Sequence, residues 1–292
     1  MKKVFLILTL ITLGAMLFAC TGIPEGSGNP DPANQANEIP APATPSGQPN
    51  GSETQVPSVT PNGETNVIPG EDTSLPAADP LAGKAVYVRA KTNGLNVRRG
   101  AGTDFASLGT LDKGDMVVYL GEADGWYKTY YRSEVAYVSA SEKYTDLYTM
   151  DKGSDEIEAV IDVGLRLLGT PYVYGATRYH NGNGKKLSGF SADAFDCSSL
   201  MQYMYYIGAD VKLDLTTRTQ ISQGKKVTEL KRGDLMFFTN ASRKDKTGIE
   251  RVGHVALYLG DNYILHTASD HAVIEEISST RWSYYIQANR MI

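Results

Sequence analysis

The amino-acid sequence predicts a small all-β barrel followed by an α+β domain. Short apolar runs separated by turn residues occupy residues 84–148, which is typical of a small barrel. From Gly153 onwards apolar residues recur at helical spacing, and a second helical segment and several strand-like runs follow. Helices followed by consecutive antiparallel strands are typical of an α+β domain. The chain of 292 residues has room for both domains and for a long linker.

The first 20 residues have the features of an export signal. Lys2 and Lys3 form a basic start, and the apolar stretch over residues 4–18 is short for a membrane-spanning helix. The sequence LFAC at residues 17–20 resembles the lipobox of bacterial lipoproteins, which implies that Cys20 carries a lipid. The alternative is an ordinary cleaved signal with an incidental cysteine. A lipid on Cys20 would hold an exported protein on a membrane surface rather than through the membrane.

Residues 21–83 are expected to form a disordered tether. The segment is rich in Pro, Gly, Ser, Thr and acidic residues, holds twelve of the 13 prolines of the chain, and contains neither lysine nor arginine. Too few apolar side chains are present to offset the entropy cost of ordering the backbone. As a flexible coil, the segment would hold its ends about 45 Å apart. That length suits a protein that reaches from a membrane into a surrounding polymer.

Charge and cysteine usage narrow the functional classes. The formal net charge is −5 and no basic stripe is present, so binding to nucleic acid is not expected. The two cysteines are Cys20 and Cys197, and a lipid on Cys20 would leave Cys197 without a disulfide partner. An unpaired cysteine in an exported protein is expected to have a structural or functional role. Cys197 is either a buried small apolar residue or a nucleophile.

Four sequence elements of the predicted barrel resemble the bacterial SH3-like domain. They are LNVRRGAGT at 95–103, GTLDKGD at 109–115, GWYK at 125–128 and AYVS at 136–139. The resemblance implies an SH3-like fold over residues 84–148, and such domains commonly bind cell-wall peptides. Trp126 and Tyr127 are candidates for a binding groove, although core packing is favoured for Trp126.

The second domain is predicted to place Cys197 at the start of a helix. A first helix is expected from Asp155 to a stop at Gly169, and a second from Cys197 to a stop at Gly208. Asp196 has the side chain of an N-cap, which would put Cys197 in the first turn. There the helix dipole favours the thiolate, which is the attacking form.

A thiolate nucleophile needs a base, usually a histidine. Of the 4 histidines, His254 and His266 lie in consecutive strand-like runs. If residues 260–262 form a three-residue loop, the two side chains share one sheet face as diagonal neighbours, with Cβ atoms about 7–8 Å apart. A two-residue loop would put the two histidines on opposite faces of the sheet. If they act together in catalysis, the three-residue loop is therefore predicted. His180 and His271 are expected to be exposed loop residues, and no metal site is expected because a fourth ligand is lacking.

Residues 152–292 carry motifs that resemble the NlpC/p60 family of papain-like cysteine peptidases. The motifs are GTPYVYGA at 169–176, DCSSL at 196–200, GDLMFF at 233–238 and HVALYLG at 254–260. The resemblance implies a papain-like α+β fold with an antiparallel sheet. It also implies hydrolysis of peptidoglycan stem peptides without a cofactor, typically at the bond between D-γ-glutamate and diaminopimelate or lysine.

The same resemblance implies the roles of the site residues. Cys197 would be the nucleophile, His254 the base and then the acid, and His266 the residue that orients His254. The substrate would be contacted by Tyr172 near the oxyanion and by Asp196 and Ser198 at its amino-terminal end. A catalytically silent wall-binding lipoprotein, and an amidase or acyltransferase on the same fold, are the alternatives. A monomer is expected.

The segment 177–195 is longer than the link that is usual in the family. It contains Lys185 and Lys186, is too polar to be core, and is expected to act as a lid or specificity wall, or else to be a solvated loop without consequence. Asp214 and Leu215 stand where a proline and an arginine are usual. These departures leave the substrate details open.

Overall fold

The structure is a computed structural model that describes residues 81–268 and 270–292. The predicted signal sequence, Cys20 and the tether as far as residue 80 lie outside the described residues. All described residues belong to one compact unit of the chain. Within this part of the chain, no helix is long and apolar enough to cross a membrane.

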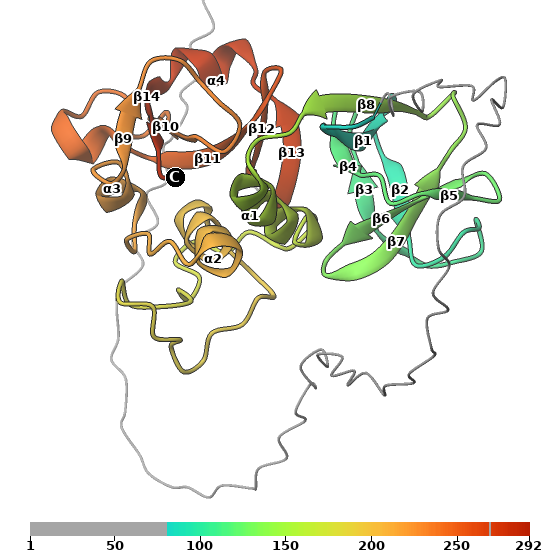
Figure 1. Ribbon diagram of the computed structural model, residues 1–292, viewed down its shortest axis with the longest axis horizontal. Coiled ribbons are helices and arrows are strands. Elements are labelled where there is room, and N and C mark those ends of the chain that lie inside the picture. Colours follow the sequence, from blue (N-terminus) through green and yellow to red (C-terminus); the bar gives the residue numbers. More distant parts are fainter. Residues whose placement is uncertain (1–80, 269) are drawn as a thin grey trace, which may run out of the picture. The chain divides into compact units, whose positions relative to one another are not determined.

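The first domain is an all-β structure made of two antiparallel sheets, as the sequence predicts (Figure 1). The strand orders are β4-β1-β8 and β3-β2-β7-β6-β5. Val88, Val97, Val117 and Val138 are fully buried between them. The strands are β1 (Lys84–Ala90), β2 (Leu95–Arg98), β3 (Ser107–Leu111), β4 (Met116–Val118), β5 (Glu122–Ala123), β6 (Trp126–Tyr131), β7 (Glu134–Ser139) and β8 (Thr145–Asp151).

The second domain combines short helices with one antiparallel sheet of order β13-β12-β11-β10-β14-β9. The α+β fold with an antiparallel sheet is therefore confirmed. Its helices are α1 (Asp155–Arg166), α2 (Cys197–Ala209), α3 (Thr217–Gln220), η1 (Gly248–Arg251) and α4 (Ser279–Ser283). Its strands are β9 (Lys225–Val227), β10 (Leu235–Phe238), β11 (His254–Gly260), β12 (Tyr263–Thr267), β13 (Ala272–Glu276) and β14 (Tyr285–Arg290).

Each face of this sheet has its own apolar cluster. Leu257 and Leu265 belong to the large core that also contains Val160 of α1 and Met204 of α2. The opposite face carries a smaller cluster, which includes Ala256, Met236, Phe238 and Ile264. Because His254 and His266 stand an even number of residues from Ala256 and Ile264 in their strands, they lie on the face of the smaller cluster.

Helix α2 does not end at Gly208, so that prediction was wrong. The helix continues to Ala209 and stops at Asp210, whose φ of 52° is left-handed. A Cβ atom on Gly208 would lie 2.5 Å from the Cα atom of Val160 in α1. Gly208 is therefore a packing residue that allows α1 and α2 to approach closely.

The connection between β11 and β12 differs from the predicted three-residue loop. The turn has two residues, Asp261 and Asn262, and both have positive φ angles of 48° and 68°. Such a pair of left-handed residues is typical of a tight hairpin turn. The strand register shifts by one residue between Tyr258 and Gly260. This bulge restores the parity that the two-residue turn would have removed, so the two histidines still share one face.

Candidate active site

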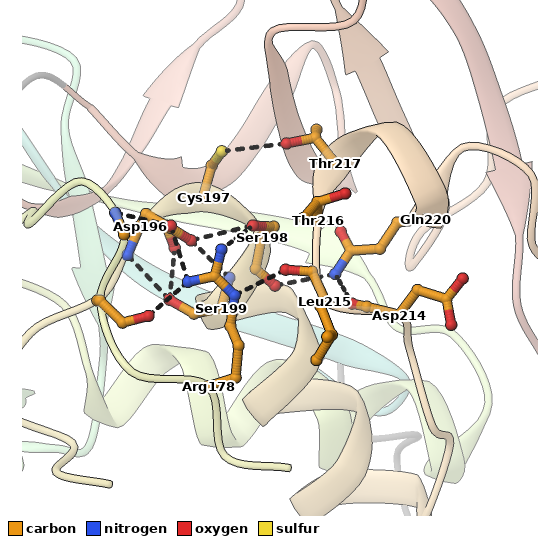
Figure 2. Close-up of polar contacts among 12 residues, drawn as sticks. Arg178, Asp196, Cys197, Ser198, Ser199, Asp214, Leu215, Thr216, Thr217 and Gln220 are labelled. Carbon is orange, nitrogen blue, oxygen red and sulfur yellow. Dashed lines mark hydrogen bonds and ion pairs between the residues drawn. The ribbon is translucent and has the colours of Figure 1, made fainter. Parts of the chain in front are cut away.

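Helix α2 begins directly after Asp196, whose side chain caps it as the sequence predicts. Oδ1 of Asp196 accepts the N–H of Ser199 at 2.8 Å, and Oγ of Ser199 accepts the N–H of Asp196 at 2.9 Å (Figure 2). This reciprocal cap fixes the first turn of the helix. Cys197 is the first helical residue, so its thiol lies at the positive end of the helix dipole.

The Cys197 thiol is nearly buried, with 8% of the residue exposed. Its Sγ atom lies 3.8 Å from Oγ1 of Thr217, and the backbone N–H of Val255, the residue after His254, also hydrogen-bonds the sulfur. Burial raises the pKa of the thiol, and the charge of Asp196 raises it further, while these hydrogen bonds only partly oppose the rise. The resting thiol is therefore protonated. The helix dipole alone does not supply the thiolate, and a base is required.

A chain of polar groups runs across three neighbouring strands from His254. Nε2 of His254 in β11 lies 3.0 Å from Nδ1 of His266 in β12. Nε2 of His266 lies 2.9 Å from Oε1 of Glu275 in β13, and Nη2 of Arg281 donates to the same oxygen at 2.9 Å. The structure thus brings the two predicted histidines together and adds a carboxylate and a guanidinium behind them.

The carboxylate of Glu275 determines where the ring hydrogens lie. Burial would raise the pKa of Glu275, but the hydrogen bond with His266 and the charge of Arg281 outweigh it and lower that pKa to about 2. Because a carboxylate only accepts hydrogen bonds, Nε2 of His266 carries a hydrogen. Nδ1 of neutral His266 then accepts the hydrogen on Nε2 of His254. Nδ1 of His254 is left unprotonated and available as a base.

Both imidazoles are held in the neutral form. Burial, together with His266 and Arg281, lowers the pKa of His254 well below 6.5. Burial also lowers the pKa of His266, although the hydrogen bond with Glu275 opposes this. At neutral pH His254 can therefore accept a proton.

Two cavities meet beside these groups and share Tyr172, Asn240 and Gly253. The first, of about 410 Å³, is also lined by Asp196, Cys197 and Ser198. The second, of about 570 Å³, is also lined by His254 and Arg281. The cavities therefore gather all the predicted site residues of this domain except His266, which lies fully buried next to His254. Among the described residues, no group of three or more His, Cys, Asp and Glu side chains is arranged to hold a metal.

Sequence reasoning missed Glu275, Arg281 and Arg178. Glu275 is the diagonal neighbour of His266, because His266 pairs with Val273 across β12 and β13. Alternation alone cannot choose between Glu275 and Glu276 until that register is known. Arg178 lies in the extra segment and reaches Asp196 at 2.9 Å, a contact that no local pattern reveals.

The other two histidines are not the exposed loop residues that were predicted. His180 is 0% exposed, its Nδ1 accepts the N–H of Gly182, and its ring packs 5.0 Å from the ring of Tyr206 in α2. His271 is half-buried, and its Nδ1 lies 2.9 Å from Oδ1 of Asp270. Neither histidine lines the cavities that contain Cys197 and His254.

The segment 177–195 was predicted to be too polar to pack in the core, but several of its aromatic side chains pack against α2. The ring of Tyr179 lies 5.1 Å from that of Phe190, and Phe190 stacks on Tyr203 of α2 at 5.3 Å. These aromatic contacts and buried His180 attach the segment to α2. Lys185 and Lys186 are exposed, and neither lines a cavity beside Cys197.

In the first domain, Trp126 differs from the core packing that was favoured for it, and Tyr127 does not line the groove for which it was a candidate. Trp126 is half-buried and lines a cavity of about 400 Å³ with Arg98 and Tyr144. Tyr127 packs against the core and lies 5.5 Å from the ring of Tyr119. A ligand of this cavity would therefore meet the aromatic rings of Trp126 and Tyr144, and not that of Tyr127.

Comparison with known proteins gives matches for both domains. The NlpC/P60 family model matches residues 169–291, and the bacterial SH3 domain model matches residues 93–144. The chain is 30% identical over 139 residues to the peptidoglycan endopeptidase RipA of Mycolicibacterium smegmatis, which covers 46% of this chain and 26% of that protein. It is 31% identical over 147 residues to the peptidoglycan DL-endopeptidase CwlO of Bacillus licheniformis, which covers 49% of this chain and 29% of that protein.

These matches span less than a third of the length of either relative. Among solved structures, an NlpC/P60 family protein of Bacillus cereus superposes with a TM-score of 0.38 and 21% identity, over 71% of this chain and 63% of that one. The two family models agree with the domain order described above. The chain therefore carries a bacterial SH3 domain followed by an NlpC/P60 domain.

Proposed function

We propose that this protein is a cell-wall peptidoglycan hydrolase, a cysteine endopeptidase that cuts stem peptides. The observation that carries the proposal is the hydrogen-bonded pair of His254 and His266. Strand β11, which contains His254, contacts the Cys197 thiol through the N–H of Val255. A thiol at a helix start beside a neutral imidazole is the arrangement that nucleophilic catalysis needs. The peptidoglycan endopeptidases among the relatives support the substrate class.

In the proposed reaction, Nδ1 of His254 takes the thiol proton as Cys197 attacks the scissile carbonyl. The N–H groups in the first turn of α2 and the hydroxyl of Tyr172 stabilise the oxyanion. His254 then returns the proton to the leaving amine, and an acyl-enzyme remains on Cys197. Water activated by the same imidazole hydrolyses the acyl-enzyme. His266 sets the tautomer of His254 before the proton transfer and holds its ring in place throughout.

The proposed bond joins D-γ-glutamate to the next residue, diaminopimelate or lysine. The carboxyl side of the cut would occupy the cavity next to His254, and the amino-terminal side would occupy the cavity next to Cys197. Tyr172, Asp196 and Ser198 line the latter. Tyr172 and Ser198 are proposed to contact the substrate there directly, and Asp196 through the groups that its carboxylate holds in place. The SH3 domain is proposed to bind the wall, and a lipid on Cys20 to anchor the exported protein to a membrane.

Digestion of purified peptidoglycan, followed by mass spectrometry of the fragments, tests this function. The expected products carry new termini on either side of the bond after D-γ-glutamate. Cys197→Ala should give no products and should keep the unfolding midpoint nearly unchanged, because alanine is a small apolar residue like the buried thiol. Intact peptidoglycan with the unaltered protein would support a silent wall-binding protein instead. Release of whole stem peptides with a free amine on the first residue, leaving glycan without peptide, would indicate an amidase.

A further inference from the structure

We propose that Arg178 makes this site select stem peptides whose first residue is acylated, and that it disfavours peptides with a free amino terminus. The inference rests on the proposed function and specifies its substrate. It concerns the cavity next to Cys197, where Arg178 from the extra segment lies beside Asp196 (Figure 2). A carboxylate in this place would ordinarily suit an ammonium group, but here it is already paired.

The carboxylate of Asp196 has no acceptor position left for a substrate. Oδ1 accepts the N–H of Ser199 at 2.8 Å and the hydroxyl of Ser198 at 3.0 Å. Oδ2 accepts the N–H of Gly175 at 3.2 Å and pairs with Nη1 of Arg178 at 2.9 Å. A carboxylate offers about four acceptor sites, and these four donors use them all.

The guanidinium of Arg178 is fixed on several sides. Nε donates to the carbonyl of Leu215 at 2.7 Å, Nη1 also donates to the carbonyl of Ala176, and Nη2 donates to Oγ of Ser198 at 3.1 Å. The side chains of Arg178 and Asp196 are only 17% and 6% exposed. A paired arginine this well held stays in place when a substrate enters, so an ammonium cannot displace it cheaply.

One donor of Arg178 remains available to a ligand. Nη2 carries two N–H groups, and one of them donates to Ser198, while the other has no partner among the described residues. An acyl group on the first residue of a stem peptide offers a carbonyl oxygen, which is the acceptor that this N–H lacks. An ammonium group offers only further donors. The hydrogen bonding at this position therefore favours the acylated peptide.

The charge of the cavity acts in the same direction. Arg178, Arg218 and Arg243 line it, and Asp196 is the one carboxylate among its lining residues. Glu250 lies close by but is already paired with Arg218 at 2.8 Å and with Arg243 at 3.2 Å. Even with Glu250 counted, the arginines outnumber the carboxylates. A positive excess repels an ammonium and tolerates a neutral amide.

The test compares two stem peptides that differ only at the amino terminus. One has a free amine on L-alanine, the other an N-acetyl group, and both continue with D-γ-glutamate and then diaminopimelate or lysine. We expect kcat/KM to be about tenfold or more higher for the acetylated peptide. Equal or faster cleavage of the free-amine peptide would overturn this inference but leave the proposed function intact. Cleavage of neither peptide would overturn the proposed function and the inference with it.

Variants at the two arginines separate the ion pair from general charge. Arg178→Gln should lower the preference for the acetylated peptide several-fold, because Asp196 regains an open acceptor, while Arg178→Lys should keep most of it. Arg218→Gln is the matched control, since it removes the same charge from the same cavity without touching Asp196. An equal loss of preference in Arg178→Gln and Arg218→Gln would contradict a specific role for Arg178. Unfolding midpoints show whether each variant folds. The ratio of kcat/KM for the two peptides, measured on the unaltered protein, tests the inference even if a variant does not fold.

Discussion

Nε2 of His266 lies 2.9 Å from Oε1 of Glu275, and this contact extends the site by a fourth member. Glu275 is held in turn by Arg281, and the lowered pKa of its carboxyl group keeps it ionised at neutral pH. The ionised acceptor fixes the hydrogen of His266 and, through it, the tautomer of His254. Glu275 therefore acts as a positioning residue for the proposed base.

Replacing Glu275 should impair turnover more than binding. We expect Glu275→Ala to lower kcat about 10- to 100-fold with little change in KM, because the wrong tautomer of His254 becomes accessible. Glu275→Gln should retain more activity, since its carbonyl oxygen can still accept from His266. Steady-state kinetics on a defined stem peptide measures both. Glu276→Gln is the control, because Glu276 is exposed and pairs with Asn262 instead; equal losses at both positions would refute the assignment.

The two histidines should differ in how completely they are needed. His254→Ala should remove nearly all hydrolysis, because the proposed base is lost. His266→Asn should retain more activity than His266→Ala, since an amide oxygen can accept the hydrogen on Nε2 of His254. Initial rates for the three variants provide the test. Wild-type activity in both His266 variants would show that His266 does not orient the base.

The pH profile should reflect the depressed pKa of His254. A base must be unprotonated to act, and burial with the nearby His266 and Arg281 keeps His254 unprotonated well below pH 6.5. The acidic limb of kcat/KM is therefore expected below pH 6.5. Arg281→Gln removes a positive charge that lowers the pKa of both imidazoles, so the limb should move to higher pH. Arg251→Gln, at an exposed position, should leave the limb in place, and an unmoved limb in Arg281→Gln would count against this account.

Local patterns predicted the two domains, the strands β10 to β14 of the sheet in the second domain and the start of α2. Asp196 as an N-cap and the shared face of His254 and His266 were readable because caps and strand parity depend on neighbouring residues. Even so, the expected three-residue loop is absent. The two histidines share a face because a two-residue turn is combined with a bulge in β11.

The remaining parts of the site depend on contacts between distant segments. Glu275 reaches His266 only in one register of β12 and β13, and Arg178 reaches Asp196 only because the extra segment folds back over α2. His180 lies in a segment that is expected to be a solvated loop, but the rings of Tyr179 and Tyr206 pack against it. A helix stop at Gly208 is what the sequence predicts, because glycine commonly ends a helix. Tertiary packing decided each of these cases.

The extra segment should contribute to stability through its aromatic residues and not through its lysines. Phe190 packs on Tyr179 and Tyr203, so Phe190→Ala is expected to lower the free energy of unfolding by about 2 kcal/mol. Lys186→Ala, at an exposed position, should change it by less than about 0.5 kcal/mol. Urea unfolding of both variants gives the comparison. A neutral Phe190→Ala would mean that the segment is attached to α2 by other contacts.

Two helical glycines should differ in how strongly the same substitution destabilises the protein. In Gly208→Ala the new Cβ would lie 2.5 Å from Cα and 2.6 Å from N of Val160, and a helix backbone cannot yield without separating α1 from α2. In Gly164→Ala it would meet Met204 and Leu265 at 2.5 Å and 2.9 Å, but these atoms end flexible side chains that can turn away.

Alanine in place of a helical glycine gains up to about 1 kcal/mol from helix propensity alone. In Gly164→Ala this gain should offset most of the repacking, so the free energy of unfolding should stay within about 1 kcal/mol of the original. In Gly208→Ala the clash should exceed the gain and lower the free energy of unfolding by about 1–3 kcal/mol. Urea midpoints and Tm values check both. A Gly208→Ala variant as stable as Gly164→Ala would show that α1 and α2 do not need the glycine at their crossing.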